Sequence, residues 1–100
     1  MTRAKQRHPS LLRGVVMSGP KHVDEGERSH EVYALTLDVY EVAGRREELT
    51  AYNVLIPHGL LLKRGELFVP GHRLFIQGAI TSSERVVWAE DAWFDRGQRL

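Results

Sequence analysis

Residue types that support catalysis are scarce in this sequence. No cysteine is present among its 100 residues, which excludes disulfides, thiolate nucleophiles and thiolate metal ligands. Ser82 and Ser83 fall in a predicted turn with no histidine or glycine-rich elbow beside them. Glu90 and Asp91 point to opposite faces of a predicted strand, which does not suit a carboxylate pair. The histidines lack metal-ligand spacing and stand at His8, His22, His30, His58 and His72. We therefore expect no enzyme, no metal site and no cofactor.

Aromatic rings and arginines suggest a different chemistry, the non-covalent binding of a polymer. Residues 70–94 alternate apolar and polar residues on both sides of a short turn, and both tryptophans of the chain lie in the second half of this stretch. Flat rings can stack unpaired bases, and cations can follow the phosphates of a single strand. The stretch is therefore the first place to look for a binding surface.

The charge pattern narrows the choice of partner. A net charge of +1 is too small for the chain to coat polyanions through bulk charge. Residues 1–23 nevertheless carry five basic and no acidic residues, whereas acidic residues gather in 24–31, 41–48 and 84–95. The basic end is interpreted either as a solvated tail or as a phosphate contact.

Length and composition predict one globular domain. One hundred residues with 42% hydrophobic and 27% charged content can form a single core. No apolar run is long enough for a bilayer span, and the N-terminus has no apolar signal core. We expect a cytoplasmic protein without a membrane partner.

Five segments show the alternation that is typical of strands with one buried face. A sixth segment, bounded by Pro57 and Pro70, has leucines at helical spacing, and it predicts one short helix. The predicted strands are residues 11–18, 31–42, 49–56, 72–81 and 85–94.

This order of elements predicts an all-β fold, a five-stranded OB-fold barrel with one short helix between strands 3 and 4. Gly14 and Gly78 fall inside strands, at places where a small barrel must bend or where two backbones approach closely. The predicted organisation is a flexible basic arm at 1–10, the OB-fold domain at 11–95 and a frayed C-terminus at 96–100.

Three spacings give the sequence a family resemblance. Pro20 follows Gly14 by six residues, Tyr52 precedes Gly59 by seven, and residues 71–78 read "GHRLFIQG". In these places, and in the end of its last strand, the chain resembles the bacterial single-stranded DNA-binding proteins and their relative, the primosomal replication protein of the B type. The resemblance covers roughly residues 11–94.

The resemblance implies binding of single-stranded DNA without sequence preference, in replication, recombination or repair. It also implies a homodimer or homotetramer and contacts with replication or repair proteins. Two features of those proteins are missing here: an acidic tail that recruits partners, and a long finger between the last two strands. We therefore expect neither tail-borne recruitment nor extensive wrapping of DNA.

Strand parity sorts the aromatic residues. In strand four, Phe75 should point outward; in strand five, Trp88 should do so, and a bulge near Glu90 would leave Trp93 exposed. Trp93 is assigned to a subunit interface or to packing against the N-terminal arm. Tyr52 is a candidate because it stands where the family has an aromatic residue.

The predicted nucleic-acid-binding residues are rings that could stack on bases and neighbouring cations that could contact phosphates. Each has an ordinary alternative, since rings are often core or interface residues and surface arginines are often merely solvated. The set is Trp88, Phe75, Tyr52, Tyr40, Arg13, Lys21, Arg45, Arg46, Arg73 and Arg85. Two other functions remain open: an OB module that binds a partner protein, supported by the acidic patch of Glu90, Asp91 and Asp95, and RNA binding.

Overall fold

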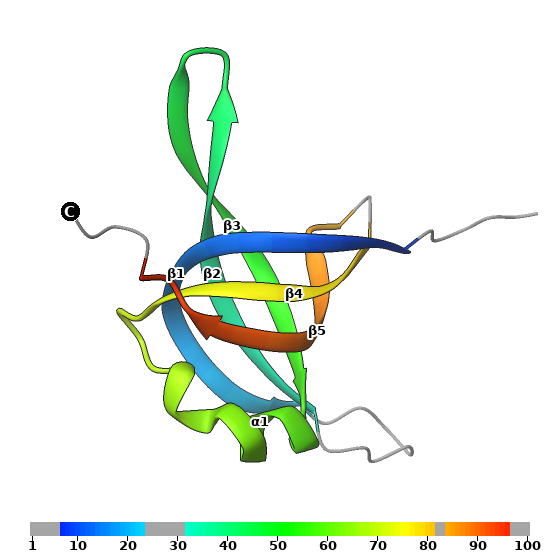
Figure 1. The fold of residues 1–100 in the computed structure, drawn as a ribbon. Coiled ribbons are helices and arrows are strands. Elements are labelled where there is room, and N and C mark those ends of the chain that lie inside the picture. Colours follow the sequence, from blue (N-terminus) through cyan, green and yellow to red (C-terminus); the bar gives the residue numbers. More distant parts are fainter. Residues whose placement is uncertain (1–6, 24–31, 82–83, 97–100) are drawn as a thin grey trace, which may run out of the picture.

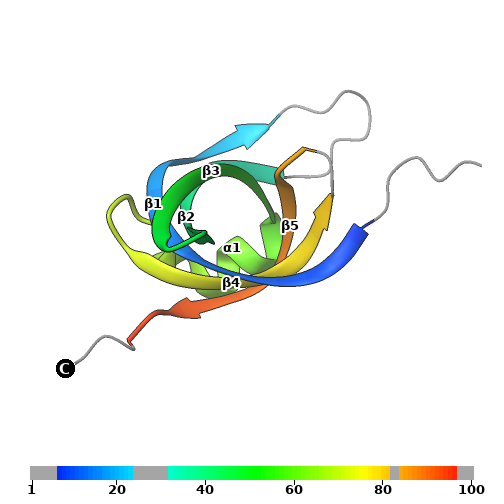
Figure 2. The same ribbon diagram turned by 90° about the horizontal axis from the view of Figure 1, so that it is seen from above.

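The computed structural model describes residues 7–23, 32–81 and 84–96. The strands close into a barrel in the order β1-β2-β3-β5-β4, as Figures 1 and 2 show. This confirms the predicted five-stranded OB-fold barrel with a short helix between the third and fourth strands. In chain order the elements are β1 (Arg7–Val23), β2 (Val32–Ala43), β3 (Arg46–Pro57), α1 (His58–Arg64), a 3₁₀ turn (Gly65–Leu67), β4 (Arg73–Thr81) and β5 (Val86–Phe94).

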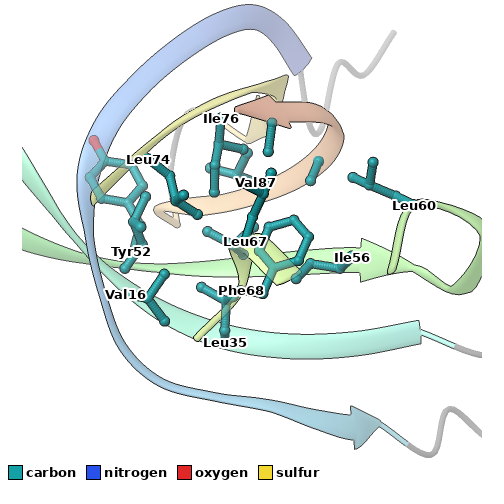
Figure 3. Packing of buried hydrophobic residues seen from close by; sticks show 14 of the residues in the cluster. Val16, Leu35, Tyr52, Ile56, Leu60, Leu67, Phe68, Leu74, Ile76 and Val87 are labelled. Carbon is teal, nitrogen blue, oxygen red and sulfur yellow. The ribbon is translucent and has the colours of Figure 1, made fainter. Parts of the chain in front are cut away.

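The core follows from the alternation of each strand. Leu35 and Leu37 of β2, Val54 and Ile56 of β3, and Ile76 of β4 are buried, and their neighbours in sequence point outward. Figure 3 shows Leu35, Ile56 and Ile76 converging inside the barrel, together with Leu60 of α1 and Leu67 of the 3₁₀ turn. Burial of one face of every strand is the main stabilising contribution, at about 25 cal/mol for each Å² of apolar surface.

Strand β1 is longer than predicted at both ends. It begins at Arg7, so residues 7–10, expected in the arm, pair with β4 instead. It also continues past Gly19 to Val23, because Gly19 adopts a φ of 93° and register shifts near it carry the strand through the turn. Residues 1–6 of the expected arm, and 97–100 of the expected frayed end, lie outside the described residues.

Gly14 marks the point where β1 changes partner. Residues 7–15 pair with β4, and the strand pairs with β2 from Gly14 onward. A Cβ atom on Gly14 would overlap the carbonyl oxygen of Asp38 on β2. Only glycine therefore lets the two backbones approach closely enough to close the barrel here.

The helix closes one end of the barrel. Pro57 ends β3 and stands at the N-cap of α1, and Leu60 and Leu67 point from the helix and the following turn into the core. Figure 2 shows α1 lying beneath the ring of strands. No helix of the described residues is long and apolar enough to cross a membrane.

Strands β2 and β3 extend beyond the barrel as a hairpin. Their pairing runs without a break from Val32↔Pro57 to Ala43↔Arg46, and the turn uses Gly44 at a φ of 69°. Figure 1 shows the tip of this hairpin projecting away from the barrel, at the end opposite α1. The predicted charged tip of 43–48 is shorter than expected, because β3 already begins at Arg46.

The bulge predicted in β5 is confirmed. Gln77 pairs with Asp91 and Gly78 pairs with Ala89, which leaves Glu90 as an extra residue. The bulge restores Ala92 to the core and leaves Trp93 39% exposed. Gly78 is required opposite the bulge, since a Cβ atom there would overlap the carbonyl oxygen of Trp88.

Candidate nucleic-acid interface

A groove of about 430 Å³ lies where the second half of β1 crosses β2 and β3. Lys21 and His22 on its β1 side are exposed, and Thr36 and Asn53 supply polar groups from β2 and β3. Leu35 lies beneath it, so its floor is the outer side of the core. Sequence analysis included Lys21 but missed His22, Thr36 and Asn53. The outward parity of Thr36 and Asn53 was the only available signal.

Trp88 shares an outward row with this groove. Lys21 pairs with Ala34 of β2, Ala34 with Leu55 of β3, and Leu55 with Trp88 of β5. Side chains at directly paired positions lie on the same face of a sheet, so this row runs along the outer surface. Trp88 is half-buried, whereas Val87 and Ala89 on either side of it are buried, as parity predicted. Ala34 is small, so little side-chain volume separates Lys21 from Leu55 in this row.

Arg85 stands at the same surface. Its carbonyl oxygen accepts a hydrogen bond of 3.0 Å from the backbone N–H of Asn53, which fixes the start of β5 beside the groove. Arg85 is exposed and has a φ of 52°, an uncommon conformation for a residue other than glycine. Lys21 thus begins the row that ends at Trp88, and Arg85 adds a second positive charge three residues before Trp88 in the chain.

Three other outward rings and one arginine form a second group, which we call the stacked row: Tyr40, Arg13, Phe75 and Trp93. The guanidinium of Arg13 lies 4.8 Å from the centre of the Tyr40 ring. Arg13 pairs with Phe75 across β1 and β4, and Phe75 stacks on Trp93 at 6.0 Å and 25°. The structure therefore separates Phe75 from Trp88, although the sequence analysis predicted both as stacking rings of one binding surface.

Arg13 is engaged by a buried acid. Its Nε donates to Oδ2 of Asp95 at 2.9 Å, and the Asp95 side chain is only 2% exposed. A phosphate would have to compete with this carboxylate, so Arg13 is less available for phosphate than we expected. Asp91 is paired in a similar way with Arg64 at 3.2 Å. Two of the three acids in the expected acidic patch are thus balanced by arginines.

Tyr52 is not at the surface, and the expectation of an exposed ring is wrong. It is 8% exposed and packs in the core, where Figure 3 shows it beside Leu74. Tyr52 has the same strand parity as the buried Val54 and Ile56, and this parity indicated burial. The family resemblance was nevertheless given more weight in choosing Tyr52 as a site residue. Its hydroxyl donates to Glu41 at 2.7 Å.

The remaining predicted cations lie apart from one another. Arg45 and Arg46 are exposed at the hairpin tip, beside Glu47 and Glu48. Arg73 is exposed at the start of β4, and its carbonyl oxygen accepts from the N–H of Asp95, close to the stacked row. Of the predicted residues, Lys21 lines the groove, Trp88 ends the outward row that begins at Lys21, and Arg85 stands just before β5. We call these three residues and the groove the groove surface. Among the described residues, no three histidine or acidic side chains are grouped so that they could hold a metal ion.

No family model and no curated protein sequence matches the chain. Solved structures do match its fold. A small single-stranded DNA-binding protein from Streptomyces coelicolor has a TM-score of 0.72 at 14% identity, over 96% of this chain and 100% of that one. The second single-stranded DNA-binding protein of Mycobacterium smegmatis, SSBb, has a TM-score of 0.67 at 14% identity, with 95% of each chain covered.

The chain has the OB-fold of bacterial single-stranded DNA-binding proteins. OB-folds bind oligonucleotides on the face of strands 2 and 3, between the loop joining strands 1 and 2 and the loop joining strands 4 and 5. The groove at Lys21, Thr36 and Asn53 lies on this face of the present barrel. The location of the groove within the OB-fold thus agrees with the position of Trp88 and the nearby cations.

Proposed function

We propose that the protein binds single-stranded DNA on its groove surface, without catalysis and with little sequence preference. The observation that carries the proposal is the outward row from Lys21 to Trp88, which borders a groove on the ligand-binding face of an OB-fold. A base would stack on Trp88, while Lys21 and Arg85 would contact phosphates. Stacking on one ring contributes about 1 to 3 kcal/mol for each base.

The fold likeness to the two bacterial proteins supports DNA as the ligand, because both are named single-stranded DNA-binding proteins. Work in replication, recombination or repair, in the cytoplasm and beside other proteins of those processes, is part of the same proposal. RNA binding would use the same rings and cations. Parallel titrations with oligo-dT and oligo-U distinguish the two.

Tryptophan fluorescence tests this proposal, since Trp93→Phe leaves Trp88 as the only tryptophan and Trp88→Phe leaves Trp93. We expect oligo-dT to quench the Trp93→Phe variant strongly. Its affinity should weaken as salt rises, with a log–log slope of about 0.7 for each phosphate contacted. Absence of quenching at micromolar protein in low salt would contradict the proposal.

Alanine variants then locate the base. Trp88→Ala should weaken binding about 5- to 150-fold, the equivalent of about 1 to 3 kcal/mol. Trp93→Ala is the matched control, because it removes the same side chain from the same strand but from the stacked row. A larger effect of Trp93→Ala than of Trp88→Ala would move the binding surface to the stacked row.

We also propose that the chain self-associates as a dimer or tetramer through β1 and its neighbours. In the described pairings, residues 11–13 pair with β4 and not with β2, so a further strand could pair with the other edge of this short segment. Leu11 is 57% exposed there, and it borders a hollow of about 350 Å³ together with Pro9 and Trp93. The balanced charge of Arg13 makes this surface better suited to protein than to phosphate. The same features support the alternative function, an OB module that binds a partner protein.

A further inference from the structure

At the root of the β2–β3 hairpin, where it leaves the barrel, two acidic residues face each other across the strands. Glu41 stands directly opposite Glu48 in the register of the two strands. Like charges at directly opposed positions destabilise a sheet. Glu48 is exposed, but Glu41 is half-buried, so the Glu41 carboxylate needs partners of its own.

Two hydroxyl groups of β3 supply those partners. The Oγ1 of Thr50 donates to Oε1 of Glu41 at 2.8 Å, and the Oη of Tyr52 donates to Oε2 at 2.7 Å. Each carboxylate oxygen therefore accepts one short hydrogen bond. Both donors follow Glu48 in β3 and lie on its barrel side, so the Glu41 side chain reaches back toward the barrel and away from the opposing acid.

The Tyr52 ring gives this contact a fixed base. The ring packs among core residues, while its hydroxyl reaches the rim where the hairpin leaves the barrel. The Tyr52 hydrogen bond is the largest cause that lowers the pKa of Glu41, followed by that of Thr50, and the charge of Arg85 on the neighbouring β5 segment acts in the same direction. The ionised carboxylate thus links a core residue, Tyr52, to the hairpin.

Beyond this rim, the hairpin has little else in the described contacts to hold it. Val42 is 75% exposed and Leu49 is 56% exposed, and the strand segments around the tip pair only with each other. A two-stranded ribbon by itself is marginally stable in water. Its direction relative to the barrel therefore depends strongly on the contacts at its root, which are the hydrogen bonds of Glu41 and the contact of Arg13 with the Tyr40 ring.

We propose that Glu41, held by Tyr52 and Thr50, is a positioning residue that fixes the direction of the hairpin. It would thereby set where Arg45 and Arg46, which lie outside the groove surface, meet a strand that extends past the groove. The fixing of the hairpin stands on the contacts alone. The effect on binding rests on the proposed function. Tyr52 would then serve the binding surface from inside the barrel rather than as a stacking ring.

Hydrogen exchange tests the fixing of the hairpin without any nucleic acid. Tyr52→Phe removes the hydroxyl and keeps the ring, and Thr50→Val provides a second variant of matched shape. We expect amides of 40–50 to exchange about fivefold faster in either variant, the equivalent of one hydrogen bond of about 1 kcal/mol, relative to any change at β4 amides. Tyr33→Phe is the control, because Tyr33 is a half-buried tyrosine that packs on His22 and His58, away from Glu41. Equal changes in the hairpin and in β4 would overturn the proposal.

The salt dependence of oligo-dT binding tests the second step. Replacing Arg45 and Arg46 by Gln should lower the log–log slope by up to about 1.4, which is two phosphates at about 0.7 each. Tyr52→Phe should lower the slope as well and should add little to the double arginine variant. A slope unchanged by Tyr52→Phe would overturn the effect on binding. If the wild-type protein does not bind oligo-dT at all, the proposed function fails, while the exchange experiment still decides whether Glu41 holds the hairpin.

Discussion

The roles of several residues in this barrel differ from those that their residue types suggest. Tyr52 has the residue type of a stacking platform, but its ring stabilises the core and its hydroxyl holds Glu41. Arg13 has the residue type of a phosphate contact, but it neutralises Asp95 and covers the Tyr40 ring. Trp88 is the ring that we propose for stacking on a base, because it shares its outward row with Lys21.

At the residue scale, Glu41 should make folding stability sensitive to acid. Hydrogen bonds from Tyr52 and Thr50 lower the pKa of Glu41 below its ordinary value of 4.5. Its contribution is therefore fully present above the unfolded pKa and is lost as the pH falls through the lower, folded pKa. Urea denaturation between pH 6 and pH 2 should show a smaller acid-induced loss of unfolding free energy in Glu41→Gln than in the wild type. Because Asp91 also has a lowered pKa, from the Ala92 N–H and Arg64, part of the acid sensitivity should remain in that variant. Identical pH profiles for the two proteins would contradict this assignment.

At the scale of elements, glycines decide where strands can approach each other. Gly14 and Gly78 stand where a Cβ atom would overlap a carbonyl oxygen of the neighbouring strand, at the partner change of β1 and at the bulge of β5. Gly65, in contrast, lies after α1 with open space around it and a φ of −58° that any residue can adopt. The same substitution should therefore have opposite effects at these sites.

Thermal and urea denaturation of two alanine variants test this contrast. Gly78→Ala should lower the free energy of unfolding by about 1 to 3 kcal/mol, because the added methyl group forces the β4 and β5 backbones apart. Gly65→Ala should raise it by about 0.4 to 1 kcal/mol, since alanine reduces the conformational entropy of the unfolded chain. Equal stability of the two variants would show that the close approach at Gly78 is not structurally required.

At the scale of the whole molecule, the barrel presents two different surfaces. The groove surface carries Trp88, Lys21 and Arg85. The stacked row and Leu11 form another surface, on which the charge of Arg13 is balanced by Asp95. This division suits a protein that binds a polyanion on one side and a second copy of itself on the other. A protein that used one surface for both would lose affinity for DNA whenever it assembled.

Sedimentation velocity should show a dimer or tetramer at tens of micromolar protein. Leu11→Glu should shift it toward the monomer, because a charge would be buried at the proposed interface. Leu62→Glu is the matched control, since Leu62 is a 73% exposed leucine on α1, away from β1. A wild-type monomer, or equal effects of both substitutions, would contradict the assignment of this surface.

The sequence by itself determined the features that depend on neighbours along the chain. A strand has a side-chain period of two, so alternation placed Val87 and Ala89 inside and Trp88 outside, and the break in that pattern located the bulge at Glu90. Pro57 and Pro70 bounded the helix because proline interrupts both kinds of backbone pairing. These local rules were sufficient for the order of elements and for the barrel.

Only the tertiary structure decided which outward side chains meet. Arg13 and Asp95 are 82 residues apart in sequence, and their contact exists because the barrel closes. Closure also separated Phe75 from Trp88, since each strand position is matched to particular positions on two neighbouring strands. Alternation states which face a residue occupies, but register between distant strands determines its neighbours on that face, and register depends on the packing of the whole core.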